Sequence, residues 1–171
     1  MQIHLLRHAI ASLQRSGQPG GDRARRLTAE GREKMRFGAQ GMRELGIAID
    51  LVLCSPLVRC RQTARIVVTR LRPRPTLRTL AALQPGVAPA ELIHAIAQLP
   101  SSTSVLLVGH EPGLSSLASL LIAGPGADLS LLFKKGALCR IDFPGTPQPG
   151  SGRLIHHLSP RILRRLGGSK S

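Results

Sequence analysis

Short apolar runs alternate along the chain with longer segments in which apolar residues recur at helical spacing. The strand-like runs are residues 3–6, 50–54 and 104–108, a weaker run around Leu77, and the pair 137–143 and 153–158. The helical segments are residues 28–45, 56–71, 90–98, 114–123 and 160–166. Alternation of this kind is typical of a mostly parallel sheet covered by helices. We therefore predict a single-domain α/β fold, with a mostly parallel central sheet and helices on both faces.

Two helix starts carry capping signals. Thr28 is placed to cap the first helix, with Glu30 in the first turn and an end near Leu45. Ser55 and Pro56 have the residue types of an N-cap and a first helical position, so the second helix is expected to begin there. The apolar face of that helix is expected to comprise Leu57, Cys60, Ala64, Val67 and Leu71.

Length and composition narrow the class of protein. The 171 residues, of which 42% are hydrophobic, suit one domain with a single aliphatic core, since aromatic residues make up only 2%. We expect this domain over residues 1–166 and a flexible tail over residues 167–171.

Three cysteines without metal-ligand spacing favour a reducing compartment. Polar residues interrupt the N-terminal apolar stretch, and no apolar run approaches the ~20 residues of a membrane span. We expect a cytoplasmic protein that does not associate with membranes.

The formal net charge of +15 comes almost wholly from arginine. Such a charge attracts nucleic acid, membranes and anionic substrates alike. Arg61, Arg65 and Arg72 are expected to form a solvated stripe along the second helix. A basic nucleic-acid-binding protein is therefore one alternative. It is disfavoured because the chain has almost no aromatic residues for base stacking and no nucleic-acid-binding motif.

Candidate phosphate ligands stand where three predicted strands end. Arg7 and His8 follow the first strand, His110 follows the run 104–108, and Arg59 lies in the first turn of the helix after the run 50–54. Parallel strands place their carboxyl ends at one edge of the sheet, where ligands bind. Arg59 is about 200° around the helix axis from Arg61, so it does not belong to the solvated stripe. Two guanidinium forks, two imidazoles and a helix N-terminus suit a phosphoryl group.

Four segments of the chain carry a resemblance to a known family. The segment 5–9 (LLRHA) resembles the Arg-His-Gly signature of the histidine phosphatase superfamily, which has the phosphoglycerate mutase-like fold. The segments 55–64 (SPLVRCRQTA) and 108–112 (VGHEP) resemble its second motif and its second-histidine motif. The segment 22–31 (DRARRLTAEG) is similar to the Asp-x-x-Arg-Pro-Leu-Thr-x-x-Gly segment of the SixA-type phosphohistidine phosphatases.

Two positions depart from the family pattern. Ala9 replaces the usual Gly, and a residue this small still lets a phosphate approach. Arg26 replaces the usual Pro, which makes Arg25 the matched ligand and Arg26 its competitor. His4, His94, His156 and His157 match no motif, and we expect them to be structural or surface residues.

The resemblance implies catalysis by His8, Arg7, Arg59 and His110. Neutral His8 would attack phosphorus and form a phosphohistidine intermediate, which water then hydrolyses. Arg7 and Arg59 would bind the phosphoryl oxygens, Arg25 would add a contact, and a cationic His110 would donate a further hydrogen bond. No metal and no cofactor are expected, because the arginines supply the positive charge.

The leaving group separates the subclasses of this superfamily. Its phosphoesterases and mutases carry a Glu or Asp after the second motif, which can protonate an alkoxide. The matching stretch here, residues 80–86, contains no carboxylate. Glu111 is the remaining candidate acid, although its place before Pro112 favours a helix-start role. We therefore expect a phosphohistidine-containing protein as the substrate.

Two other enzyme classes are alternatives to this hypothesis. The nearer one is a small-molecule phosphomonoesterase of the same superfamily, which shares every motif and differs in its leaving group. The other is a cysteine phosphatase, whose loop requires an arginine six positions after the cysteine. From Cys54 that spacing reaches Cys60 rather than Arg59 or Arg61. The cysteine mechanism is therefore disfavoured.

Overall fold

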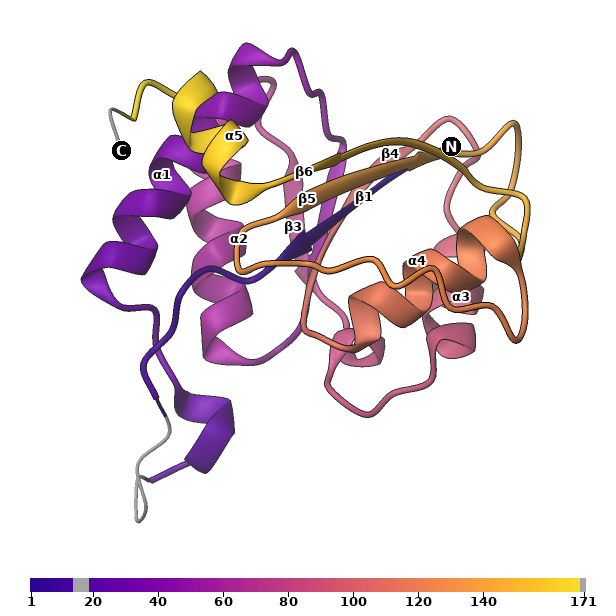
Figure 1. Ribbon diagram of the computed structural model, residues 1–171, viewed down its shortest axis with the longest axis horizontal. Helices are drawn as coiled ribbons and strands as arrows, with labels where there is room; N and C mark the ends of the chain where they lie inside the picture. Colours follow the sequence, from indigo (N-terminus) through magenta and orange to yellow (C-terminus); the bar gives the residue numbers. More distant parts are fainter. Residues whose placement is uncertain (14–18, 170–171) are drawn as a thin grey trace.

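A six-stranded sheet with helices on both faces forms the molecule (Figure 1). The computed structural model describes residues 1–13 and 19–169. The strands are β1 (Gln2–Arg7), β2 (Leu51–Cys54), β3 (Thr76–Thr79), β4 (Ser104–Gly109), β5 (Leu138–Asp142) and β6 (Arg153–Leu158). The helices are α1 (Ala29–Glu44), α2 (Val58–Arg70), α3 (Pro89–Ala97), α4 (Gly113–Ala123) and α5 (Pro160–Leu166), with 3₁₀ turns at Gly21–Ala24 and Ala81–Leu83.

The sheet has the strand order β3-β2-β4-β1-β5-β6. The first four strands in this order pair in parallel, and β5 and β6 continue the sheet as an antiparallel pair. The predicted mostly parallel α/β fold is therefore confirmed. Its carboxyl edge brings together the residues that follow β1, β2 and β4.

Two aliphatic clusters, one on each face, hold the helices to the sheet. Residues of α3 and α4 pack on one face, against side chains such as Leu5 and Leu107. Residues of α1, α2 and α5 pack on the other, against side chains such as Leu6 and Val108. Neighbouring strand residues point to opposite faces, so the apolar residues of β1 and β4 serve both clusters.

The first helix begins where the sequence predicts. The Thr28 hydroxyl accepts a hydrogen bond from the Gly31 amide at 2.9 Å, and the Thr28 amide donates to the Ile10 carbonyl at 3.0 Å. A Cβ atom at Gly31 would lie only 2.1 Å from the same carbonyl oxygen. Glycine is therefore required for α1 to approach the loop that follows β1, and this contact fixes the position of that loop.

The second helix begins later than the sequence analysis expected. It starts at Val58, and the residue at its N-cap position is Leu57. The prediction that Ser55 caps the helix is wrong, because its hydroxyl lies 2.9 Å from Nε2 of His110 and accepts from the Leu57 amide at 3.4 Å rather than from an amide of the first helical turn. The predicted apolar face is confirmed, since all five of its residues are buried.

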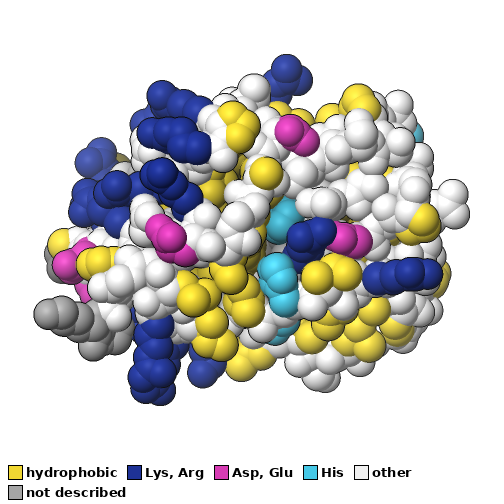
Figure 2. All heavy atoms as spheres, turned by 90° about the horizontal axis from the view of Figure 1, so that it is seen from above, with side chains coloured by type: hydrophobic (Ala, Val, Ile, Leu, Met, Phe, Trp, Pro, Cys, Tyr) yellow, Lys and Arg dark blue, Asp and Glu magenta, His cyan; other side chains and the backbone are white. Residues whose placement is uncertain are grey.

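Charge is distributed unevenly over the two helical layers. Residues 79–133, which include α3 and α4, contain no lysine or arginine. In Figure 2 the basic side chains gather toward the side where Figure 1 places α1, α2 and α5, and they are sparse on the opposite side. Arg61, Arg65 and Arg72 are exposed, as the predicted stripe requires.

Several features concern the chain ends and the loops. Residues 14–18, between β1 and α1, and residues 170–171, at the end of the predicted tail, lie outside the described residues. The Gly167 amide closes α5 on the Leu163 carbonyl, and the flexibility of the tail stays a prediction. Within the described chain, no helix is long and apolar enough to cross a membrane.

Candidate active site

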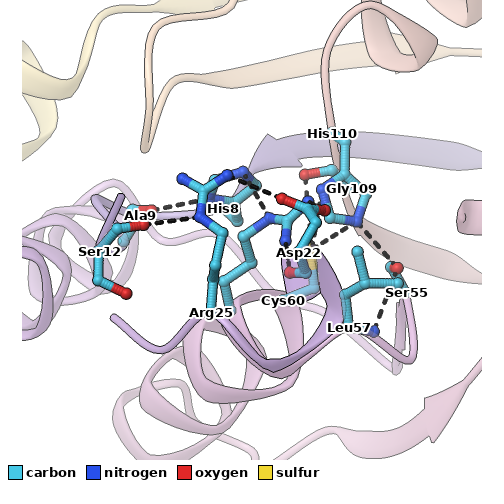
Figure 3. A network of polar contacts seen from close by, with 11 residues as sticks. His8, Ala9, Ser12, Asp22, Arg25, Ser55, Leu57, Cys60, Gly109 and His110 are labelled. Atoms are coloured by element: carbon cyan, nitrogen blue, oxygen red, sulfur yellow. Dashed lines mark hydrogen bonds and ion pairs between the residues drawn. The ribbon is translucent and has the colours of Figure 1, made fainter. Parts of the chain in front are cut away.

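The two imidazoles expected at the site lie together at the carboxyl edge of the sheet. In the register of β1 and β4, Arg7 pairs with Gly109, so His8 and His110 leave neighbouring strands side by side. Their ring centroids are 5.2 Å apart, with the planes inclined at 60°. Figure 3 shows both rings facing the same network of polar side chains. Two histidines about a hundred residues apart in sequence therefore form one cluster.

His8 is held as a neutral ring with one unprotonated nitrogen, Nε2. Its side chain is buried (6% exposed), and its Nδ1 lies 2.7 Å from the Ala9 carbonyl oxygen. Because a carbonyl can only accept, we assign the proton to Nδ1. Nε2 then accepts a hydrogen bond from Nε of Arg59 at 3.2 Å. Burial lowers the pKa of His8 to about 3. At neutral pH, Nε2 can therefore act as a nucleophile.

Arg59 lies at the centre of the polar network. It is only 4% exposed, which confirms that it faces away from the solvated stripe of α2. Its NH1 donates to the Asp22 backbone carbonyl at 2.8 Å, and its NH2 forms an ion pair with the Asp22 carboxylate at 2.9 Å. The guanidinium therefore contacts both the His8 ring and the loop that includes Asp22.

Arg25 joins the same carboxylate from the other side. Its NH1 lies 2.8 Å from Oδ1 of Asp22, and its Nε donates to the Ser12 carbonyl. Arg26 is exposed and takes no part, so the structure brings Arg25 rather than its competitor to the site. Hydrogen bonds from Arg25 and Arg59 hold the pKa of Asp22 below its usual value, although burial acts in the opposite direction. The carboxylate thus occupies two cations that could bind a phosphoryl group.

Sequence reasoning missed Asp22. The only available signal was its fixed spacing from Arg25 in the segment 22–31, and that signal does not show which arginines a carboxylate will contact. Gln62 was missed as well: its side-chain oxygen accepts from the Leu27 amide at 2.8 Å and ties α2 to the same loop.

The surroundings of His110 favour its neutral form in the free protein. Its Nε2 lies 2.9 Å from the Ser55 hydroxyl and 3.4 Å from the Cys60 thiol. Burial lowers the pKa of His110 to about 4, and the Arg59 charge acts in the same direction. Burial and the Arg59 charge therefore favour the neutral ring in the free protein, and a cationic His110 beside a bound phosphoryl group stays a prediction.

Arg7 and Glu111 clamp the same backbone segment. The Arg7 NH1 donates to the Phe133 carbonyl at 2.6 Å, and the Phe133 amide donates to Oε1 of Glu111 at 3.1 Å. The second carboxylate oxygen of Glu111 accepts from the Ser115 hydroxyl in the first turn of α4. Arg7 lies close enough to both imidazoles for its charge to lower their pKa values. Both oxygens of Glu111 are thus engaged in holding backbone and helix.

A recess of about 290 Å³ opens beside His110. It lies between residues 82–89 and the start of α4, and its lining is mostly apolar. Glu111 is the one charged residue among its described lining residues. Within the described residues, no three His, Cys, Asp or Glu side chains are grouped to hold a metal ion. A leaving group placed in this recess would meet few groups able to protonate it.

Comparison with known proteins identifies the family to which this chain belongs. Residues 3–84, which include His8, Arg25 and Arg59, match the histidine phosphatase superfamily (branch 1). An uncharacterized protein of Picosynechococcus sp. is 30% identical over 131 residues, covering 72% of this chain and 74% of that protein. This chain belongs to the histidine phosphatase superfamily.

Within the superfamily, the chain is similar to SixA proteins along nearly its whole length. Phosphohistidine phosphatase SixA of Escherichia coli is 26% identical over 167 residues, covering 96% of this chain and 97% of that protein. The structure of the protein histidine phosphatase SixA complexed with tungstate superposes with a TM-score of 0.81 at 26% identity, covering 95% of this chain and 99% of that one. The fold of this histidine phosphatase is accordingly phosphoglycerate mutase-like.

The ion pairs of Asp22 yield a prediction for anion binding. Asp22→Asn should bind inorganic phosphate about fivefold more tightly. The substitution removes the repulsion between the carboxylate and the anion, which is about 1 kcal/mol for like charges at contact distance in water. The measurement is the inhibition constant of phosphate. Asp128→Asn, which removes an equal charge on the side without arginines, should leave the constant unchanged. Weaker phosphate binding by Asp22→Asn would show that the carboxylate orders the arginines rather than competing with the anion.

Proposed function

We propose that this histidine phosphatase removes phosphate from phosphohistidine on proteins through a covalent intermediate on His8. The observation that carries the proposal is the state of His8: a buried neutral ring whose Nδ1–H is fixed by the Ala9 carbonyl and whose Nε2 faces an arginine. A nucleophile needs an available lone pair at the operating pH. The lowered pKa provides it without a separate general base.

The reaction has two displacements at phosphorus. In the first, Nε2 of His8 forms a bond to phosphorus, the P–N bond of the substrate breaks, and the departing imidazole takes up a proton from water. In the second, water attacks the phosphoryl group, His8 departs with its lone pair restored, and inorganic phosphate leaves. Arg59, Arg7 and Arg25 would bind the phosphoryl oxygens throughout, because guanidinium forks match their geometry and charge.

Binding of the phosphoryl dianion would change the state of His110. The pKa of His110 is low in the free protein because burial and Arg59 disfavour the cation. A dianion beside the ring favours the charged form, so the pKa should rise on substrate binding. His110 would then donate a hydrogen bond to the phosphoryl group, which is the role expected from the sequence, but only in the complex.

The choice of phosphohistidine rests on the leaving group. Residues 80–86 contain no carboxylate, and both oxygens of Glu111 are engaged. An alkoxide leaving group normally requires a general acid, whereas the P–N bond of phosphohistidine is already activated. The similarity to SixA proteins supports the same substrate class.

No metal or cofactor is part of the proposal, and the free, buried cysteines accord with a reducing cytoplasm.

A comparison of substrates tests the proposal. Free phosphohistidine or phosphoramidate should be hydrolysed with a kcat/KM about a hundredfold or more above that for phosphoserine, because general acid catalysis contributes about 10²- to 10⁴-fold and is needed mainly by the ester. The measurement is phosphate release at neutral pH from equal substrate concentrations. Comparable rates on both classes would instead identify a phosphomonoesterase of the same superfamily.

A further inference from the structure

A basic groove runs between α2 and the edge strand β3, outside the candidate active site. One hollow of about 650 Å³ is bordered by Arg61, Arg65 and Arg78. A second, of about 430 Å³, is bordered by Arg65 and Arg74. The two hollows share Arg65 and Leu77, so they form one groove along β3. We call it the β3 groove.

The four arginines of the β3 groove have no anionic partner in the part of the chain that the structure describes. All four side chains are exposed, and the residues that line the two hollows include no Asp or Glu. Among the described residues, the ion pairs involve only arginines and lysines outside the groove. Arg72, the third residue of the predicted stripe, differs, since it donates to the Thr69 and Leu71 carbonyls. The groove thus concentrates positive charge that the rest of the described chain does not neutralise.

The groove begins beside the active site. Pro56 lines its first hollow, and the preceding Ser55 is hydrogen-bonded to His110. Thr79, at the carboxyl end of β3, lines the same hollow. The carboxyl ends of β2 and β3 lie on the same edge of the parallel sheet as those of β1 and β4. A chain bound with one residue near His8 could therefore continue into the groove.

The shape of the groove suits an extended segment. β3 is the last strand of the sheet, so its outer side has no neighbouring strand. Its four residues span about 13 Å. Arg78 in this edge strand and Arg74 just before it repel a second copy of the same strand and attract an acidic one. Electrostatic complementarity of this kind increases specificity for the partner and the rate of association.

We propose that the β3 groove binds an acidic extended segment of the phosphorylated protein substrate, next to the residue that is dephosphorylated. This inference rests on the proposed function for the identity of the substrate, and it adds the chemistry by which the partner is recognised. Nucleic acid is the competing occupant. Against it, the groove lining holds no aromatic side chain on which a base could stack.

Binding of two fluorescein-labelled peptides tests the groove independently of turnover. Both contain one unmodified histidine, followed by four Glu in the first peptide and four Gln in the second. At low ionic strength the wild type should bind the Glu peptide about tenfold more tightly, and the preference should shrink with added salt. Arg61→Glu/Arg65→Glu should abolish it. Equal binding of the two peptides by the wild type would overturn the proposal.

The matched control is Arg161→Glu/Arg165→Glu, which reverses two exposed charges at the same spacing on α5. It should retain the preference for the Glu peptide. If both double variants lose the preference for the Glu peptide equally, the proposal is overturned, because the net charge of the protein rather than the groove would then cause the preference. Thermal unfolding of each variant verifies that it is folded.

Two further arms separate the alternatives. Hydrolysis of free phosphohistidine should be equal in the wild type and both double variants; absence of hydrolysis in the wild type would refute the proposed function while the peptide result still decides the groove. A labelled 20-nucleotide DNA duplex tests the competing occupant. One outcome is that Arg61→Glu/Arg65→Glu weakens binding of the duplex while its affinities for both peptides equal those of the wild type. In that case the groove is a nucleic-acid site and the proposal is wrong.

Discussion

His8→Ala is expected to lower kcat/KM for free phosphohistidine by about a thousandfold or more. The substitution removes the atom that bonds to phosphorus, and no neighbouring group can replace it, since His110 leaves a different strand and its Nε2 is engaged with Ser55. Losses of this size are usual when a nucleophile is removed while binding groups remain. The measurement is steady-state phosphate release.

The control for this substitution is His94→Ala. His94 is exposed on α3 and lies outside the polar network, so its removal should leave kcat/KM unchanged. The loss in His8→Ala should appear in kcat, because the arginines that hold the phosphoryl group remain. A His8→Ala variant within about tenfold of the wild type would show that the chemistry does not pass through this ring.

Arg59→Ala is expected to produce the second largest loss, about a hundredfold to a thousandfold in kcat/KM. Removal of one preorganised donor to a developing oxyanion has this effect in other enzymes. Arg59 also donates to Nε2 of His8 and holds the Asp22 loop, so both the ring and the loop lose a contact. Arg59→Lys should recover only part of the activity, because an ammonium cannot make the forked contacts.

Arg61→Ala provides the comparison for Arg59→Ala. The two residues lie on the same helix, but Arg61 is exposed whereas Arg59 is 4% exposed. With free phosphohistidine as the substrate, Arg61→Ala should behave like the wild type. Equal losses in the two variants would mean that the positive charge of α2 matters and that the position of Arg59 does not.

The sequence was sufficient to predict the fold and the gathering of the main side chains. Arg7, His8 and His110 follow strands that are mostly apolar, and parallel strands place such residues at one edge. Arg59 and Arg61 could be assigned to different faces because both lie on one regular helix. These features depend only on local periodicity and on a general rule of sheet topology.

Other features depend on contacts that periodicity does not encode. Ser55 has the residue type of a helix cap, yet its hydroxyl turns to His110, a partner 55 positions away. Asp22 belongs to an irregular loop, and its pairing with Arg59 depends on how that loop folds over α2. The protonation of His110 follows from burial and from the Arg59 charge, which are known only once the chain is folded.

Trapping the phosphoenzyme tests the central claim most directly. Wild-type protein mixed with ³²P-labelled phosphohistidine and quenched in alkali within the first turnover should carry label that is stable to base and labile to acid. Peptide mapping should place that label on His8. Stable label on another residue, or turnover with no labelled protein at any quench time, would contradict a reaction that proceeds through Nε2 of His8.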